Sequence, residues 1–577
     1  MGSEQAPRSR RWLPLLAALA PLLVFAPTLL HGFLLDDYVL YRDSPSLGDL
    51  SSISRGFTLD VGAVRKGAAT AISSYYRPLF LAACTLYYHL VGGEPAAWHL
   101  VAVLLAALAA ALAFGVLGRL GLEPRLALLA AIAWALHPSH VGSVAWVAGI
   151  QELMAAGFAL LAVRLLLWRG EAVALPVVLA TLAFAGAVLC KEVGVALAPF
   201  VACWWLLSRQ RGAAAEEPAA APAPVARLRA ATVSMAAVTL VYLAVRVAVL
   251  GALASRLVNA PRGLAALTAV PVAAATYLQL LLLPFGFSIF RPERPVYAAM
   301  APRVLLSIGL LVALGALAVW GMRWRRSLAL PIAWFAVWLL PVLNVWALDP
   351  QWMVSDRYLF LPSLALPWLL ALVLPRRVAV ATLALLALGY AALTVRYERI
   401  FLSERTFLAA MERAEPTSPL VFAEKGRLLQ ADGDLARARV ALTRAVALDP
   451  TAPAAAIGLG DLELRRGELD AAERHYRAAL LVRPDASRGF KLVVIARAHA
   501  GERERALSLA EESARRWPQD FEVRLIEALL LAGHGERERA EAAFAAARRL
   551  RPDEPAVAGG LDAAVAALGP TVGVAPP

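Results

Sequence analysis

Long apolar runs separated by short polar segments fill the first 400 residues of the chain, and a different pattern fills the rest. An α-helix rises about 1.5 Å per residue, so about 20 apolar residues cross a bilayer core of about 30 Å. We therefore expect an all-α fold in which residues 1–400 form a polytopic membrane helix bundle of about eleven spans. The runs are 13–33, 96–118, 126–138, 152–168, 172–190, 193–208, 230–251, 302–322, 328–346, 359–374 and 378–395.

One further apolar stretch, residues 264–290, is interrupted by Pro271 and Pro284. Proline removes a backbone donor and breaks most helices. We expect this stretch to be an interfacial or re-entrant segment rather than a span.

Arginine clusters fall after alternate runs, a pattern typical of cytoplasmic loops in membrane proteins. Residues 1–12 are basic, so we expect a cytoplasmic N-terminus and an uncleaved first span. An odd number of spans then places the C-terminal residues outside the cytoplasm. The clusters also account for the net charge of +13, and without a basic tract interleaved with aromatic residues we expect no nucleic-acid partner.

A 34-residue period marks the C-terminal part of the chain and is typical of tetratricopeptide repeats (TPRs). We predict a linker helix over 401–418, four repeats forming an α-solenoid over 419–554, and a tail over 555–577. Glycine suits the turn between the paired helices, and proline ends the second helix. The series are Gly433, Gly467, Gly501 and Gly535; Ala438, Ala472, Ala506 and Ala540; and Pro450, Pro484, Pro518 and Pro552.

The strongest candidate chemistry lies directly after the first apolar run, where Asp36 and Asp37 are adjacent. Ionisable residues at a bilayer boundary are costly and often functional. Other polar residues fall on the same expected outer face, and together they suit transfer of a group from a phosphate-bearing lipid. A carboxylate can act as general base, and cations can neutralise a leaving phosphate. These residues are Arg77, His137, His140, Glu152, Lys191, Glu192, Asp356, Arg357 and Tyr358.

Each candidate also has a simpler structural interpretation. The acidic pair can be a loop at a helix end, and His137 and His140 can be capping residues rather than metal ligands. Lys191 and Glu192 can form an interfacial ion pair. The three cysteines match neither a zinc signature nor a disulfide framework. We assign no metal ligands and leave a divalent cation open as a cofactor.

Five short motifs occur in a fixed order: Asp36-Asp37-Tyr38, Tyr76-Arg77-Pro78-Leu79, His137-Pro138-Ser139-His140-Val141, Lys191-Glu192 and Asp356-Arg357-Tyr358. With the repeats behind them, they resemble the transmembrane-and-TPR (TMTC-like) branch of the protein O-mannosyltransferase relatives, which have a GT-C glycosyltransferase fold. The resemblance implies an integral membrane enzyme, and the Ala- and Arg-rich composition without organelle signals favours a bacterial inner membrane. It would move a sugar, expected to be mannose, from a polyprenyl-phosphate donor to Ser or Thr hydroxyls of extracytoplasmic proteins.

The resemblance also implies roles for individual residues. Asp36 and Asp37 would be catalytic, and Arg77, Lys191 and Arg357 would face the donor phosphate. The remaining candidates would line the cavity for the acceptor, and the extracytoplasmic repeats would present the acceptor protein. This third group is Tyr38, His137, His140, Glu152, Glu192, Asp356 and Tyr358.

A second hypothesis is a non-catalytic membrane scaffold whose repeats assemble an envelope protein complex. It is favoured by Gly142 and Ile150, which stand where members of that family commonly carry polar residues. A transporter ranks last, because the charges gather at one boundary rather than at the bilayer midplane.

Overall fold

The chain divides into two compact units, Met1–Ala414 and Glu415–Pro577. Every regular element of the described residues is helical, and a single β-bridge joins Arg291 to Val354. The computed structural model describes residues 12–42, 44–66, 75–209, 224–251, 261–286, 288, 291, 300–345, 353–482, 486–552 and 554–574. Residues 209–229 are rich in Ala, Pro, Glu and Arg, from which we expect a flexible cytoplasmic linker, and most of them lie outside this description.

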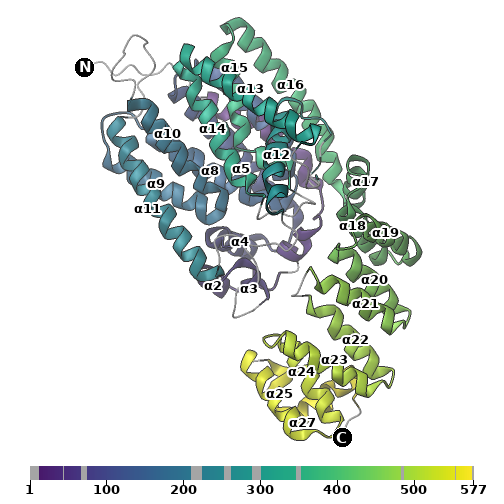
Figure 1. Cartoon of the computed structure of the whole chain (residues 1–577). Helices are drawn as coiled ribbons and strands as arrows, with labels where there is room; N and C mark the ends of the chain where they lie inside the picture. The colour runs from purple at the N-terminus through teal and green to yellow at the C-terminus, as the bar shows by residue number, and fades with distance from the viewer. Residues whose placement is uncertain are drawn as a thin grey trace. The chain divides into compact units, whose positions relative to one another are not determined.

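Seventeen α-helices of the first unit are described (Figure 1). Short α2, α3 and α4 lie together at one end of the helix bundle. The helices are α1 (Leu13–Val24), α2 (Ser51–Thr58), α3 (Val61–Lys66), α4 (Pro78–Val91), α5 (Pro95–Arg119), α6 (Pro124–Ala135), α7 (Val141–Val144), α8 (Ile150–Leu166), α9 (Ala174–Cys190), α10 (Leu197–Arg209), α11 (Val225–Leu250), α12 (Leu264–Leu282), α13 (Pro302–Trp324), α14 (Ala329–Leu339), α15 (Ala365–Val373), α16 (Arg376–Glu398) and α17 (Glu404–Ala414).

Short 3-10 segments and one π-helical turn join these helices and carry half of the predicted site residues. They are η2 (Ala26–Leu30), the π-helical turn η3 (Tyr38–Arg42), η4 (Pro138–His140), η5 (Val147–Gly149), η6 (Glu192–Ala196), η8 (Arg326–Leu328), η9 (Leu340–Leu343), η12 (Asp356–Leu359), η13 (Pro362–Leu364) and η14 (Arg399–Leu402).

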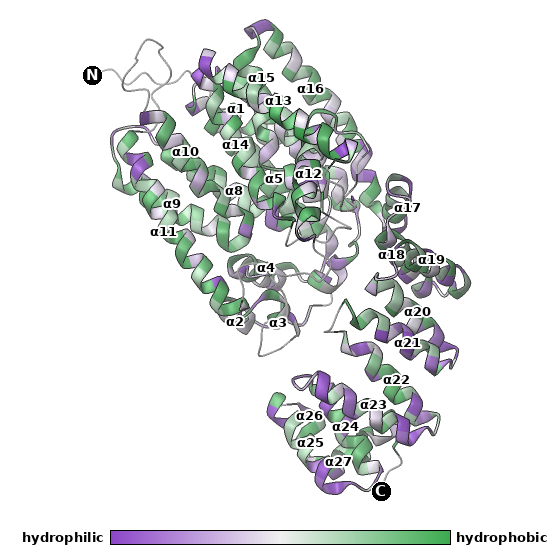
Figure 2. Cartoon of the chain, viewed as in Figure 1, coloured by the Kyte–Doolittle hydropathy of each residue, from purple (hydrophilic) through white to green (hydrophobic). Residues whose placement is uncertain are grey.

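Eight helical stretches among the described residues are long and apolar enough to cross a membrane, and a ninth is added if α6 and η4–α7, bent by 49°, count as one. Each of the eleven predicted runs coincides at least partly with a helix, but α1, α9 and α15 are shorter than a full span. The number of spans therefore stays a prediction. Figure 2 shows how strongly apolar residues dominate the first unit compared with the second.

Two expectations about where helices break or end were wrong. Helix α12 is not broken at Pro271 but continues through it from Leu264 to Leu282, and it ends before Pro284. The first apolar run is not helical to residue 33, because α1 ends at Val24 and Pro27 lies in the 3-10 segment that follows. Proline disfavours the α conformation in the residue before it. The consequence is an irregular segment, His31–Leu34, that leads into the acidic doublet.

Small residues let α5 and α8 approach closely in the middle of the first unit. Ala109 and Ala113 of α5 and Ala156 and Ala159 of α8 are fully buried. Close approach through small side chains is a common way for apolar helices to associate. This packing fixes the N-terminal end of α8, where Gln151 and Glu152 lie.

The second unit contains four consecutive helix pairs, so the predicted tetratricopeptide repeats are confirmed. The turn glycines of the four repeats all have left-handed φ values, +81°, +76°, +82° and +79° in chain order. The four series alanines are fully buried between paired helices. The helices are α18 (Pro419–Ala431), α19 (Leu435–Leu448), α20 (Pro453–Arg465), α21 (Leu469–Leu480), α22 (Ser487–His499), α23 (Arg503–Arg516), α24 (Phe521–Gly533) and α25 (Arg537–Leu550).

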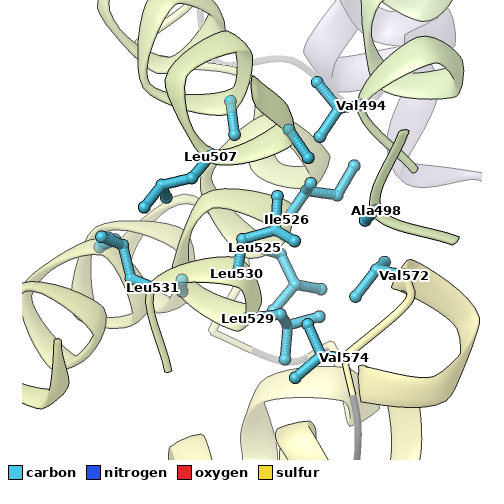
Figure 3. Packing of buried hydrophobic residues seen from close by; sticks show 14 of the residues in the cluster. Val494, Ala498, Leu507, Leu525, Ile526, Leu529, Leu530, Leu531, Val572 and Val574 are labelled. Atoms are coloured by element: carbon cyan, nitrogen blue, oxygen red, sulfur yellow. The ribbon is translucent and has the colours of Figure 1, made fainter. Parts of the chain in front are cut away.

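The segment expected as a tail is folded onto the last repeats. It forms α26 (Pro555–Ala558), α27 (Gly560–Leu568) and η15 (Gly569–Val572). Val572 and Val574 join the core of α22 and α24, as Figure 3 shows. Gly533 makes this possible, because a Cβ there would lie 2.7 Å from a Val574 methyl carbon. Repeat arrays need such terminal caps to cover their last apolar face.

Candidate functional site

The two carboxylates of the acidic doublet have different surroundings. Asp37 is 1% exposed, and its Oδ2 and Oδ1 accept hydrogen bonds from the amides of Leu34 (3.1 Å) and Ala148 (2.8 Å). Burial raises the pKa of Asp37 well above its ordinary value, although both amide donors act in the opposite direction. Asp36 is exposed. Asp37 therefore anchors the loop, and Asp36 is the carboxylate accessible from outside the protein.

Asp37 links the loop to the start of α8. Ala148 belongs to η5, and Glu152 lies in the first turn of the helix that follows. The bond from the Ala148 amide thus fixes the acidic loop against the element that carries Glu152.

Glu152 lies at the centre of a buried ionic cluster. The Lys191 ammonium donates a short hydrogen bond to Glu152 Oε1, and Arg357 Nε lies 3.6 Å from the same oxygen. Only 5% of the Lys191 and Glu152 side chains is exposed, compared with 20% for Arg357. Burial lowers the pKa of Lys191, and the adjacent Glu152 opposes that shift. Lys191 is thus already paired, whereas Arg357 is the more accessible cation.

Arg77 forms the second half of the same cluster. Its Nε donates to Glu192 Oε2 at 2.8 Å and its Nη2 to Glu192 Oε1 at 2.5 Å, while Nη1 donates to Gln151 Oε1. Burial disfavours the charged guanidinium, but the Glu192 carboxylate raises its pKa above the ordinary value. Because Gln151 and Glu152 are adjacent, the two ion pairs share one helix end.

The cluster has spare charge and spare hydrogen-bonding groups. Arg77, Lys191 and Arg357 face two carboxylates, Glu152 and Glu192, which leaves one net positive charge. The buried atoms Glu152 Oε2, Trp146 Nε1 and Arg357 Nε have no hydrogen-bond partner. Buried polar atoms without partners are uncommon in folded proteins. The unneutralised charge lies nearest the surface on Arg357, the most exposed of the three cations, and can attract a singly charged anion.

Aromatic rings flank the accessible cation. The Arg357 guanidinium carbon lies 5.1 Å from the centre of the Trp146 ring and 5.4 Å from that of Tyr358. The Lys191 ammonium lies 5.3 Å from the same Tyr358 ring. These cation–π contacts hold Arg357 in place without neutralising it.

The predicted histidines do not join this cluster. His137 Nδ1 lies 2.7 Å from Ser139 Oγ and its Nε2 lies 3.2 Å from the Leu281 carbonyl. His140 Nε2 lies 2.9 Å from Ser363 Oγ. Both rings are buried and bridge neighbouring elements. No group of three or more potential metal ligands occurs within the described part of the chain.

Asp356 and Tyr38 also lie apart from the ionic cluster. Asp356 Oδ1 accepts from Arg291 Nε at 3.0 Å, and its Oδ2 accepts from the Ser288 amide at 3.4 Å. Tyr38 packs against Phe33 at 6.1 Å between ring centres. The structure therefore brings together Arg77, Glu152, Lys191, Glu192, Arg357 and Tyr358, with Asp37 joined through the backbone of η5.

Sequence reasoning missed three contributors to the site. Gln151 and Trp146 lie within six residues of Glu152, so the motif neighbourhood could have suggested them. Glu404 accepts a hydrogen bond from the Leu35 amide across 369 residues of sequence, and no local pattern indicates that contact.

Comparisons with known proteins concern the repeats. Residues 429–493 match the tetratricopeptide repeat family. Among solved structures, the chain is similar to YrrB, described as a TPR protein with an unusual peptide-binding site, at 18% identity and a TM-score of 0.24, covering 29% of this chain and 84% of that one. It is also similar to the Cut9–Hcn1 hetero-tetramer of the APC/C, at 12% identity and a TM-score of 0.25, covering 85% of this chain and 93% of that one. No curated protein sequence matches. The second unit is thus a TPR solenoid, a class that generally binds proteins or peptides.

Proposed function

We propose that the protein is a GT-C-type membrane glycosyltransferase. It moves a sugar, expected to be mannose, from a polyprenyl-phosphate donor to Ser or Thr hydroxyls of extracytoplasmic proteins. The observation that carries the proposal is the cluster of Arg77, Lys191 and Arg357 at one helix end, linked by Asp37 to the acidic loop. Its single net positive charge suits a phosphate diester, which carries one negative charge.

The reaction is a single displacement. Asp36 removes the proton of the acceptor hydroxyl as its oxygen attacks the anomeric carbon of the donor sugar. The bond between that carbon and the phosphate oxygen breaks, and the electron pair leaves with the polyprenyl phosphate. Attack from the face opposite the leaving group inverts the anomeric configuration. No covalent enzyme intermediate forms.

The cations have separate roles in this mechanism. Arg357 stabilises the charge that develops on the leaving phosphate, because it is the most accessible and least neutralised of the three. Arg77 contributes from its pair with Glu192. Lys191 holds Glu152 in place. The protein would lie in a bacterial inner membrane, and the repeats would present the acceptor outside the cytoplasm.

A transfer assay tests the proposal. Full-length protein in phospholipid vesicles is given radiolabelled polyprenyl-phosphate mannose and envelope proteins from cells lacking the gene. We expect label on protein that β-elimination releases as reduced mannose. Asp36→Asn should remove the label, whereas the exposed Arg413→Ala should not. Wild-type protein that transfers no more label than protein-free vesicles would overturn the proposal for this donor and acceptor pool.

A non-catalytic scaffold is the second candidate. It is favoured by the pairing of Lys191 with Glu152 and of Arg77 with Glu192, because these partners make much of the cluster a self-contained ionic core. A scaffold predicts that Asp36→Asn supports wild-type assembly of the envelope complex and a wild-type phenotype. The glycosyltransferase predicts that the same variant behaves like a gene deletion.

A further inference from the structure

The backbone immediately before the acidic doublet is strained. Leu35 has φ +48°, and it is the only residue other than glycine with a positive φ within the described residues. A side chain with a Cβ disfavours this left-handed conformation. Such residues persist where surrounding contacts hold them, and they are common at functional sites.

Two carboxylates hold the strained segment. Asp37 Oδ2 accepts from the Leu34 amide at 3.1 Å, and the Asp37 amide donates back to the Leu34 carbonyl at 2.9 Å. The Leu35 amide donates to Glu404 Oε1 at 3.0 Å. The two amides that precede Asp36 are thus fixed by one carboxylate from the loop itself and one from α17.

Helix α17 is well placed to act as a rigid support. Phe407, Leu408 and Met411 are all buried, so the helix is anchored along one face. Ser288 Oγ donates to Met411 Sδ at 4.0 Å, and the Ser288 amide donates to Asp356, the residue before Arg357. Helix α17 therefore touches the acidic loop near its start and the segment that supports Arg357 near its end.

We propose that Glu404 is a positioning residue that holds Leu35 in its left-handed conformation and thereby points Asp36 toward the reacting hydroxyl. This inference rests on the proposed glycosyl transfer. In this role Glu404 acts through the backbone of the acidic loop rather than by contact with donor or acceptor. It should therefore affect the rate of the chemical step more than donor affinity.

Four variants of the full-length protein test the inference. Glu404→Ala removes the acceptor, Glu404→Gln keeps a carbonyl oxygen in its place, and Arg413→Ala changes an exposed charge on the same helix. The double variant Leu35→Gly with Glu404→Ala removes the Cβ that disfavours the left-handed conformation, so residue 35 no longer needs the carboxylate to hold it there. We expect Glu404→Ala to lower kcat about tenfold at unchanged donor KM, which corresponds to about 1.4 kcal/mol. The glutamine variant and the glycine double variant should recover most of that loss.

Hydrogen exchange gives a second readout that does not depend on activity. Amides in residues 33–38 should exchange faster in Glu404→Ala than in wild-type protein, and at the wild-type rate in Glu404→Gln and Arg413→Ala. Unchanged exchange in Glu404→Ala overturns the inference whether or not sugar is transferred. Faster exchange together with an inactive wild type supports the contact and refutes the proposed function instead. A fall in kcat that neither glutamine nor Leu35→Gly reverses would also overturn the inference.

Discussion

Adjacent aspartates with different surroundings should respond differently to the same substitution. Asp36 is exposed, while Asp37 is buried and accepts two backbone hydrogen bonds. Replacing each by asparagine keeps the side-chain size and removes the negative charge. The pair of variants therefore separates a residue that reacts from a residue that holds the loop.

The cost of Asp37→Asn follows from its partners. Both are N–H donors, from Leu34 and Ala148, but asparagine offers only one oxygen. One amide must then face the new NH2 group and lose its bond. Leaving a buried N–H donor without its acceptor costs about 1–3 kcal/mol. Asp36→Asn, on the exposed surface, should change the free energy of unfolding by less than about 0.5 kcal/mol.

Activity should show the opposite order. Removing a general base lowers a rate by about 100- to 10,000-fold, so Asp36→Asn should be nearly inactive while fully folded. Asp37→Asn should keep measurable turnover, reduced because its loop is less well held. Initial rates with labelled donor and thermal unfolding in detergent measure the two properties on the same preparations. The reasoning fails if Asp37→Asn is inactive with unchanged stability while Asp36→Asn turns over normally.

Three further predictions concern single contacts. Arg357→Gln should lower kcat and leave the unfolding temperature nearly unchanged. Lys191→Met should destabilise the protein by about 3 kcal/mol, because the buried Glu152 then keeps only Arg357, 3.6 Å away; equal stability of the two variants would contradict this. Burial raises the pKa of Asp520, but bonds from Ser487 and Lys491 outweigh burial and lower the pKa overall. The ionised Asp520 should therefore stabilise the fold above about pH 4, and this stabilisation should be lost as the pH falls further. The difference in unfolding free energy between wild type and Asp520→Asn should accordingly shrink below that pH. Gly501→Ala, at φ +82°, should destabilise the repeats by about 1–2 kcal/mol in thermal unfolding, and an unchanged midpoint would be the contrary result.

The repeats could be predicted closely because their signal is local and periodic. Each turn glycine must adopt a positive φ, and each buried alanine must fit between two helices, so the same residue types recur every 34 positions. No long-range information is needed to find them. The cap formed by Val572 and Val574 lacks such a period, and it was expected only as a tail.

The site could be predicted in outline only. The motifs correctly grouped Arg77, Lys191 and Arg357, since each follows or precedes an apolar run at the same expected end. They could not reveal that Glu152 and Glu192 pair with two of these cations, because ion pairing depends on tertiary distances. Polarity alone cannot separate residues that line a site from those that bridge elements, as His137 and Asp356 do. The contact of Glu404 with Leu35 spans 369 residues and leaves no pattern in the sequence.

The side of the membrane on which the repeats lie depends on α12. Length and composition allow this helix to cross, which would raise the predicted number of spans from eleven to twelve and place both ends of the chain on the same side. The compact arginine cluster after α13 (Arg323, Arg325 and Arg326) favours a cytoplasmic end there and hence no crossing, although Arg291, Arg294 and Arg303 flank the other end of α13. Helix α11 begins near Arg227 and Arg229, and α13 ends near Arg323, so both of these ends should be cytoplasmic. With these two ends in the cytoplasm, α11 would run outward and α13 inward, and we expect α12 to begin and end outside.

Cysteine labelling can decide between the two topologies. We expect Glu415→Cys, placed just before the repeats, to react with a membrane-impermeant maleimide in cells with a permeabilised outer membrane and an intact inner membrane. Arg325→Cys, directly after the last residue of α13, should react only after the inner membrane is lysed. The native cysteines Cys84 and Cys190 are buried and Cys203 is half-buried, and a variant with all three replaced by serine gives the background. Labelling of residue 415 only after lysis would place the repeats in the cytoplasm, where they could not present an extracytoplasmic acceptor to Asp36.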